Sequence, residues 1–128
     1  AVFGSRMLGG RYFDGGMPGW KFLGNVFLTA AINMVTLHYL TECHSGFRAY
    51  SRRYLEAVDR EANSDDFVFD TEIILQGIAQ GMRFREVPIS TRYFPEASSI
   101  SFVRSCKYGF MILGALAKFS LWRWAGIR

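Results

Sequence analysis

Apolar and polar positions along the first third of the chain predict a short strand followed by a long helix. Residues 1–5 are suited to the end of a buried strand, and residues 20–40 form a mostly apolar, helix-compatible stretch. No formal charge appears from residue 22 to residue 41, a run close to the length of a membrane span. Asn, Thr and His side chains interrupt this run, and such groups are costly in lipid. We therefore favour a helix packed within the protein over a membrane span.

Two shorter helices are expected in the middle of the chain. Ser51 is a preferred N-cap residue, and the helix that follows it is expected to reach Val58. A second helix is expected over about residues 69–80, with Gly81 ending it because glycine readily adopts the left-handed conformation found after helices. The acidic stretch between them, residues 59–66, is interpreted as a solvated turn.

The remaining pattern predicts two strands and a terminal helix. Residues 47–50 and 83–93 alternate as strands do, and Pro88 favours an edge strand or a bulge. Residues 100–128 are expected to be helical and to end in Trp and Phe side chains mixed with Lys and Arg. That mixture suits the headgroup layer of a bilayer, and a helix docked on its own core is the alternative.

Composition narrows the class of protein. The 128 residues fit one domain, and 50% hydrophobic residues are enough for a core. An aromatic content of 16% indicates extra apolar contact surface, for a lipid interface or a partner domain. A net charge of +4 favours an anionic partner. Nucleic acid is the least favoured such partner, because no basic stripe is interleaved with aromatic residues on one strand.

The cysteines and the first residue bear on the origin of the chain. Cys43 and Cys106 lie far apart and match no metal-ligand spacing, so we expect reduced thiols and a cytosolic chain. The sequence begins at Ala1, without an initiator Met or a signal peptide. We expect it to be a piece of a longer protein.

Chemically versatile side chains are concentrated in residues 41–50, TECHSGFRAY. If this segment is a strand, Glu42 and His44 share one face, where they could bind a cation or transfer a proton. The alternative is that both hydrogen-bond to neighbouring loops. Gly46 would let a backbone or a substrate approach closely, and Arg48 carries a planar fork suited to phosphate.

Arginines and hydroxyls in other loops suggest a phosphate site, whereas the acidic residues do not suggest a metal site. Arg6 and Arg92 lie in loops, the latter near Ser99, and such groups could gather around a phosphate. Scattered surface charge is the alternative. Asp65 and Asp66 follow no apolar strand and are interpreted as a solvated helix start, so no metal site is predicted in this chain.

Four motifs follow one another in an order that is specific as a set: GSRMLGG with GGMPGW, TECHSGFRAYSRRYLEAV, FVFDTEIILQ and REVPISTRYFPEASSI. Together they resemble the C-terminal half of family 2 glycosyltransferases, in the branch of dolichol-phosphate mannose synthases and bacterial polyprenyl-phosphate relatives. The resemblance covers residue 4 to about residue 109. It implies an α/β chain that is the C-terminal portion of a GT-A (Rossmann-like) fold, with helices and a few strands.

The resemblance also implies an activity and its partners. Such an enzyme transfers a sugar with inversion from a nucleotide-sugar to a polyprenyl-phosphate or similar membrane acceptor, in cell-envelope or glycan-precursor synthesis. It would lie peripherally on the cytoplasmic side of the membrane. Mg²⁺ or Mn²⁺ would be held by an Asp-x-Asp motif outside this chain. Residues 1–100 would be the acceptor-side half of the domain, without its nucleotide-binding half, and residues 101–128 an amphipathic helix at the membrane interface. The alternative is a non-catalytic membrane-surface binding module.

Site residues are carried over position by position. Arg6 matches an acceptor-phosphate ligand, Glu42 stands at the acid position near the reacting centre where the family usually has Asp, and Arg92 with Ser99 resembles the loop that closes over phosphates. Arg48 belongs to the motif that reads Ser/Thr-Gly-Phe-Arg. Because Arg6 lies in a loop, we expect its replacement to leave folding unaffected, and we expect Glu42→Gln to change activity more than stability.

Further positions are expected to support the active-site loops: Gly15, Gly16, Trp20, His44, Ser45, Gly46 and Glu72. The chain also departs from the family pattern, because Ile100 follows Ser99 where the synthases carry a lysine. This departure bears on the identity of the acceptor more than on the type of reaction. With a hydroxyl acceptor in place of a phosphate, Glu42 would be the candidate base.

Overall fold

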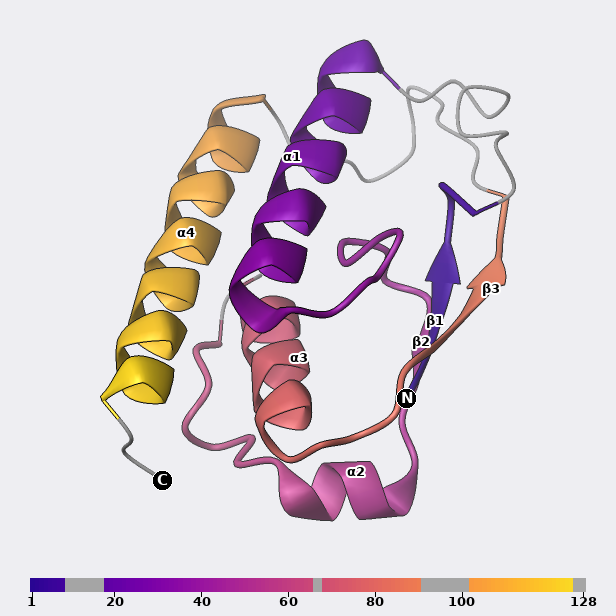
Figure 1. Ribbon diagram of the computed structural model, residues 1–128. Helices are drawn as coiled ribbons and strands as arrows, with labels where there is room; N and C mark the ends of the chain where they lie inside the picture. The colour runs from indigo at the N-terminus through magenta and orange to yellow at the C-terminus, as the bar shows by residue number, and fades with distance from the viewer. Residues whose placement is uncertain (9–17, 66–67, 91–101, 126–128) are drawn as a thin grey trace.

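The computed structural model describes residues 1–8, 18–65, 68–90 and 102–125. Within these ranges the chain forms three strands and four helices, which Figure 1 shows: β1 (Val2–Ser5), α1 (Gly19–Thr36), β2 (Arg48–Ala49), α2 (Arg52–Ala57), α3 (Phe69–Ala79), β3 (Arg85–Pro88) and α4 (Phe102–Trp124). The predicted α/β class is confirmed for these residues. The assignment to a GT-A fold stays a prediction.

The three strands form one small sheet in the order β2-β1-β3. β1 pairs antiparallel with β2, and parallel with β3, where Val2 lies opposite Arg85 and Ser5 opposite Pro88. The predicted edge position of Pro88 is confirmed within the described sheet, since β3 has a neighbour on one side only. In the central strand β1, Val2 is exposed and the three residues that follow it are buried.

α1 begins after Pro18 and ends just before Leu37, whose left-handed conformation (φ 58°) breaks the helical repeat. Its buried side chains recur at helical spacing: Asn25, Thr29, Ile32 and Thr36. Three of these four are polar, so the inner face of the helix needs hydrogen-bond partners. Within the described ranges, none of the helices combines the length and the hydropathy that a bilayer crossing requires.

α2 begins and α3 ends at the residues that the sequence predicted as their start and stop signals. The Ser51 hydroxyl accepts a hydrogen bond from the backbone N–H of Tyr54 at 3.2 Å, and Gly81 adopts a φ of 68° just after α3. The Tyr54 hydroxyl donates to the carbonyl of Ile73 at 2.8 Å, which joins α2 to α3. A Cβ on Gly77 would lie 1.9 Å from that hydroxyl, so this approach of the two helices requires glycine.

One main core joins the sheet to the helices. Its buried members come from β1, α1, the segment after α1, α3 with the residue before it, and α4: Phe3, Ile32, Leu40, Cys43, Val68, Ile74, Leu75, Ile78, Ile112 and Leu116. Because α4 contributes Ile112 and Leu116, the terminal helix docks on the core of the chain with one of its faces. Figure 1 shows α4 beside α1, and the colours show that the two helices run in the same direction.

Candidate functional site

A buried carboxylate connects three parts of the chain. Glu42 is 1% exposed and lies in the segment between α1 and β2. Its Oε1 accepts hydrogen bonds from Nε of Arg6 at 2.6 Å and from Nδ2 of Asn25 at 2.7 Å, and it also contacts Nη2 of Arg6. Its Oε2 accepts from the backbone N–H of Arg6 at 2.6 Å. Burial of a charged group is tolerated only with such pairing and hydrogen bonding, and here both are present.

The polar inner face of α1 holds this cluster in place. The Thr29 hydroxyl donates to Oδ1 of Asn25 at 3.1 Å, which orients the amide so that its N–H points to Glu42. The same hydroxyl accepts from the backbone N–H of Cys43 at 3.4 Å. The polar residues that interrupt the apolar pattern of α1 therefore bind the Glu42 segment, which makes Asn25 a site residue that the sequence analysis missed.

A second carboxylate holds the backbone on which Glu42 stands. Glu86, on β3, accepts from the backbone N–H of Thr41 at 2.9 Å, from its hydroxyl at 2.8 Å and from the N–H of Glu42 at 3.1 Å. Ser5 completes the group through a 2.6 Å contact between its hydroxyl and that of Thr41. Because a side chain satisfies these N–H groups, Thr41 and Glu42 need no strand partner. The strand considered for Glu42 and His44 is not formed, because this segment is irregular, whereas the strand predicted over residues 47–50 is present as β2.

Arg48 uses its guanidinium to hold the chain together. Its Nε donates to the carbonyl of Ser45 at 2.7 Å, its Nη2 contacts the carbonyl of Cys43, and its Nη1 lies 3.5 Å from a carboxylate oxygen of Asp70. The guanidinium carbon also lies 5.0 Å from the centre of the Phe3 ring. These contacts tie the segment after Glu42 to the start of α3. The phosphate-binding role expected for Arg48 stays a prediction.

His44 follows Glu42 by two residues and is largely enclosed. Its Nε2 is buried without a hydrogen-bond partner. Burial, and then the positive charge of Arg48, lower the pKa of His44 to about 4. The ring is therefore neutral near pH 7. The expected support role of His44 agrees with this chemistry and stays a prediction.

Other expected support residues have contacts of their own. Ser45 is buried and its hydroxyl accepts from the N–H of Phe47 at 3.2 Å, which shapes a turn. Gly46 borders open space, so no close backbone approach occurs there in the described structure. Glu72 accepts from the N–H of Ser64 at 2.8 Å and so fixes the turn before α3. Gly15, Gly16, Arg92 and Ser99 lie outside the described residues.

The N-terminal end of α1 carries positive charge that the sequence analysis did not single out. Trp20 packs edge-on against Phe102 at 5.3 Å, and the ammonium of Lys21 lies 5.4 Å from the Trp20 ring centre. Burial lowers the pKa of Lys21, and the nearby positive charge of Arg6 lowers it further. No acidic residue occupies the first turn of α1. The Lys21 ammonium, at a helix N-terminus without acidic residues, favours an anion there.

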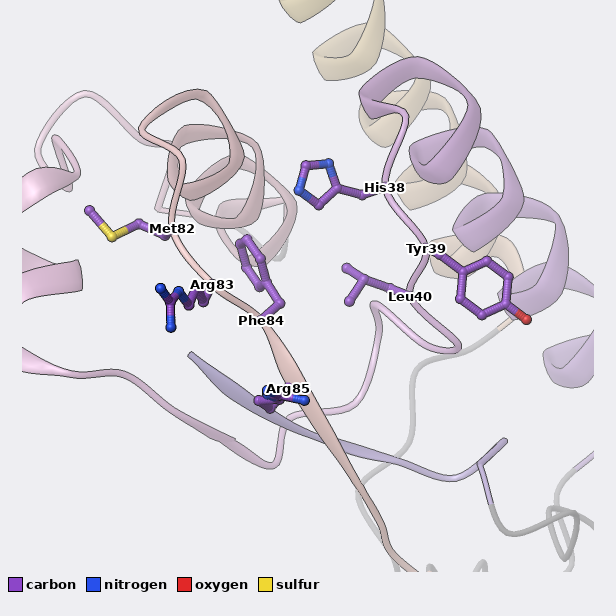
Figure 2. A pocket seen from close by; sticks show the side chains of 7 residues that line it. All are labelled: His38, Tyr39, Leu40, Met82, Arg83, Phe84 and Arg85. Atoms are coloured by element: carbon purple, nitrogen blue, oxygen red, sulfur yellow. The ribbon is translucent and has the colours of Figure 1, made fainter.

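A separate hollow of about 270 Å³ lies between the segment after α1 and the segment that leads into β3. Figure 2 shows His38, Leu40 and Phe84 facing one another across it, while Tyr39 points away. The rings of His38 and Phe84 meet edge-on at 6.1 Å. Arg83 and Arg85 are exposed beside these rings. None of the residues around Glu42 described above lines this hollow.

A metal site is not found in the part of the chain that the structure describes. No group of three or more His, Cys, Asp or Glu side chains there could hold a metal ion. The Mg²⁺ or Mn²⁺ expected with the donor therefore does not fit the described residues, and its expected ligands outside this chain stay a prediction. Cys43 is buried and Cys106 is exposed, and neither is in a disulfide within the described residues.

Comparison with known proteins gives two relatives. The chain is 32% identical over 119 residues to Agl6 of Haloferax volcanii, a hexosyltransferase of low-salt glycan biosynthesis, with 89% of the chain and 28% of that protein covered. It is 30% identical over 92 residues to the uncharacterized protein MJ1222 of Methanocaldococcus jannaschii, with 72% of the chain and 37% of that protein covered. The similarity supports a relationship to glycosyltransferases.

The extent of these matches limits what they show. The chain spans about a third of the length of the curated relatives that it matches. No protein-family model matches the chain, and no solved structure matches it significantly. The comparisons therefore support a relationship to glycosyltransferases in general. The sugar donor, the acceptor and the glycosyltransferase family are proposed below.

Proposed function

We propose that this chain is the acceptor-side part of an inverting family 2 glycosyltransferase that transfers a sugar from a nucleotide-sugar to a polyprenyl-phosphate or similar membrane acceptor. The similarity to a hexosyltransferase over 119 residues carries the proposal. The buried cluster supports it, because two of the motif residues, Arg6 and Glu42, lie 36 positions apart and form one ion pair. The pair brings two separate motifs of the resemblance together at one place in the fold.

In this proposal the acceptor phosphate binds near Arg6 and Lys21 at the N-terminal end of α1. The phosphate oxygen attacks the anomeric carbon as the bond from that carbon to the nucleotide diphosphate breaks, which inverts the configuration. Because the phosphate is already an anion, the step needs no strong base. Glu42 then acts as a positioning residue: its two oxygens are occupied by Arg6 and Asn25, and they fix the direction of the guanidinium.

The remaining site residues complete the proposal. Arg92 and Ser99 would close over the phosphates, Gly15 and Gly16 would let the neighbouring loop approach them, and Arg48 would hold the segment that carries His44. The divalent cation would be bound outside this chain, where it would offset the charge of the departing diphosphate. With a hydroxyl acceptor, Glu42 would instead have to leave Arg6 to take a proton.

A sugar-transfer assay tests the proposal on a protein that includes these residues and the proposed donor half. With limiting polyprenyl phosphate and saturating nucleotide-sugar, Lys21→Gln and Arg6→Lys are each expected to raise the acceptor KM at least about tenfold, equivalent to about 1.4 kcal/mol. Arg52→Lys is the matched control, since Arg52 is exposed and pairs only with Glu56 on its own helix in the described contacts.

The outcomes separate the two candidate functions. If the protein transfers no sugar from any nucleotide-sugar tested but still binds vesicles, the non-catalytic membrane-surface module is favoured. An unchanged acceptor KM in both site variants, measured on folded protein, would remove Arg6 and Lys21 from acceptor binding. An increase of the donor KM alone would move them to the donor side.

A further inference from the structure

The hollow beside β3 lies at the end of the sheet away from the Glu42 cluster. Arg85, in its lining, is opposite Val2 at the first residue of β1, whereas Arg6 follows the last residue of that strand. The length of β1, roughly 10 Å, therefore separates the two places. The volume of the hollow, about 270 Å³, is at the lower end of the range for small-molecule sites. It suits a single ring with one attached group and is too small for a dinucleotide.

Both walls of the hollow are fixed by hydrogen bonds to α1 and α3. The side-chain amide of Asn33 binds both backbone groups of Leu40, donating to its carbonyl at 2.9 Å and accepting from its N–H at 3.0 Å. On the other wall, the N–H of Met82 donates to the carbonyl of Gly77 at 2.9 Å. The walls are therefore already in place before a ligand arrives, and binding needs little ordering of the backbone.

The inside of the hollow is apolar and aromatic. Leu40 is buried, and the centre of the Phe84 ring lies 5.6 Å from that of Phe3 in the core. The His38 ring meets Phe84 edge-on, and Figure 2 shows both rings and Leu40 turned toward the same space. An organic ring that enters this space exchanges water for contact with these side chains.

The rim of the hollow is basic. Ala1 donates to the carbonyl of Arg83 at 2.8 Å and accepts from the N–H of Arg85 at 2.9 Å, so the pairing with β1 continues back to residue 83. Arg83 and Arg85 therefore point to the same side of an extended segment, and both are exposed. No carboxylate of the described residues forms an ion pair with either arginine, and none of the residues that line the hollow is acidic. Two such guanidinium groups favour a single anion between them.

The number of oxygens on that anion decides its class. One guanidinium fork occupies both oxygens of a carboxylate, whereas a phosphate monoester has three terminal oxygens and can accept from two forks. Exposed side chains change rotamer within nanoseconds, so both arginines can turn toward a ligand in the hollow. We propose that the hollow binds a phosphate monoester of a ring-sized organic group, with the phosphate on Arg83 and Arg85 and the ring against Phe84. Nucleoside monophosphates and sugar phosphates share this chemistry. The proposal does not rest on the transferase activity, because none of the residues assigned to sugar transfer lines the hollow.

The two walls lead directly into the contact that shapes the Glu42 segment. Leu40 precedes Thr41, and Arg85 precedes Glu86, whose carboxylate accepts from the N–H of Thr41 at 2.9 Å. A ligand that contacts both walls binds best when they are close together, and it stabilises that state by mass action. Binding should therefore also slow hydrogen exchange at the amides of residues 41 and 42.

Titration of the 128-residue chain with phenyl phosphate, followed by two-dimensional NMR, tests the site. The amides of residues 38–40 and 82–85 should shift and saturate with a Kd of about 1 mM or tighter. Inorganic phosphate lacks the ring and benzoate lacks the phosphate, so each should bind at least about fivefold more weakly than phenyl phosphate. Uridine monophosphate and glucose 1-phosphate distinguish the two sources of such a ligand, and the tighter binder identifies the class.

A pair of double variants assigns the binding to the rim. Arg83→Gln with Arg85→Gln should weaken phenyl phosphate binding at least about tenfold, and folding should persist because both side chains are exposed. Arg53→Gln with Arg60→Gln is the matched control: it removes the same charge at two exposed positions outside the hollow and should cost less than about twofold.

Four results would overturn the proposal. Equal loss in the two double variants would show a general attraction of anions to a basic chain. Shifts centred on Arg6 and Lys21 would place the phosphate in the proposed acceptor site instead. Binding of inorganic phosphate or benzoate as tight as that of phenyl phosphate would remove the ring or the phosphate from the recognised chemistry. Failure of both uridine monophosphate and glucose 1-phosphate to bind would refute the assignment to these phosphate monoesters. Because no sugar donor is present, each of these failures is distinct from failure of the transferase proposal.

Discussion

Replacing Arg6 by Ala should destabilise the fold, contrary to the expectation from its position in a loop. Glu42 is fully buried, and the guanidinium of Arg6, itself 17% exposed, is its charge partner. Removing one member of a buried pair typically costs about 3–5 kcal/mol. Here Glu42 keeps the hydrogen bonds from Asn25 and from the backbone of residue 6, so we expect a loss of about 2–3 kcal/mol in the free energy of unfolding.

Urea unfolding followed by tryptophan fluorescence measures this loss, and a double-mutant cycle assigns it. Arg6→Ala and Glu42→Gln should each lower the unfolding free energy, the latter contrary to the expectation that Glu42→Gln changes activity more than stability, because Glu42 is buried and paired. The double variant should lose at least about 1 kcal/mol less than their sum. Arg52→Ala is the control, since its ion pair with Glu56 is exposed and should contribute less than about 0.5 kcal/mol. If Arg6→Ala unfolds at the same urea concentration as Arg52→Ala, the reasoning from the buried pair is refuted.

Three further predictions concern the same region. Glu86→Ala should lower the free energy of unfolding by about 2 kcal/mol in urea titration, since it leaves two backbone N–H groups without their partner; a change as small as that of Arg52→Ala would contradict the role given to Glu86. A thiol reagent should modify Cys106 at once and Cys43 only on unfolding, because burial raises the pKa of the Cys43 thiol to about 12; mass spectrometry of native protein checks this, and modified Cys43 would refute it. The pKa of His44 is lowered in the fold to about 4, so as the pH falls the unfolded chain takes up this proton before the folded chain does. The free energy of unfolding of the wild-type chain should therefore fall between about pH 6.5 and pH 4 by about 2 kcal/mol more than that of His44→Gln. Parallel pH profiles of the two proteins would rule this out.

Local features of the fold could be predicted from the sequence because their causes are local. The Ser51 cap and the left-handed Gly81 each depend on one residue and its immediate neighbours, and both are confirmed. The edge position of Pro88 follows from its missing N–H and is confirmed in the described sheet. Such features need no knowledge of distant contacts.

The Glu42 segment could not be predicted in the same way. Its alternation resembles a strand, but the side chain of Glu86, more than forty positions later, satisfies its backbone instead of a neighbouring strand. The pairing of Arg6 with Glu42 is likewise a long-range contact. Because the sequence does not show this contact, the loop position of Arg6 suggested that its side chain was dispensable for folding. Asn25 could have been noticed, because it is one of the polar residues that interrupt the apolar pattern of α1. Its partner, Glu42, could not be predicted from the sequence of α1.

The clamp that Glu86 places on Thr41 and Glu42 has a consequence for the order of folding. Glu86 can reach those N–H groups only after β3 has paired with β1, and closing so long a loop is slow compared with forming α1 or α3. We therefore expect the Glu42 segment to acquire its shape late, after the helices that surround it. In pulse-labelling hydrogen exchange, the amides of residues 41 and 42 should become protected together with those of β1 and later than those in the middle of α3. Protection of these two amides before β1 would show that the segment folds without the clamp.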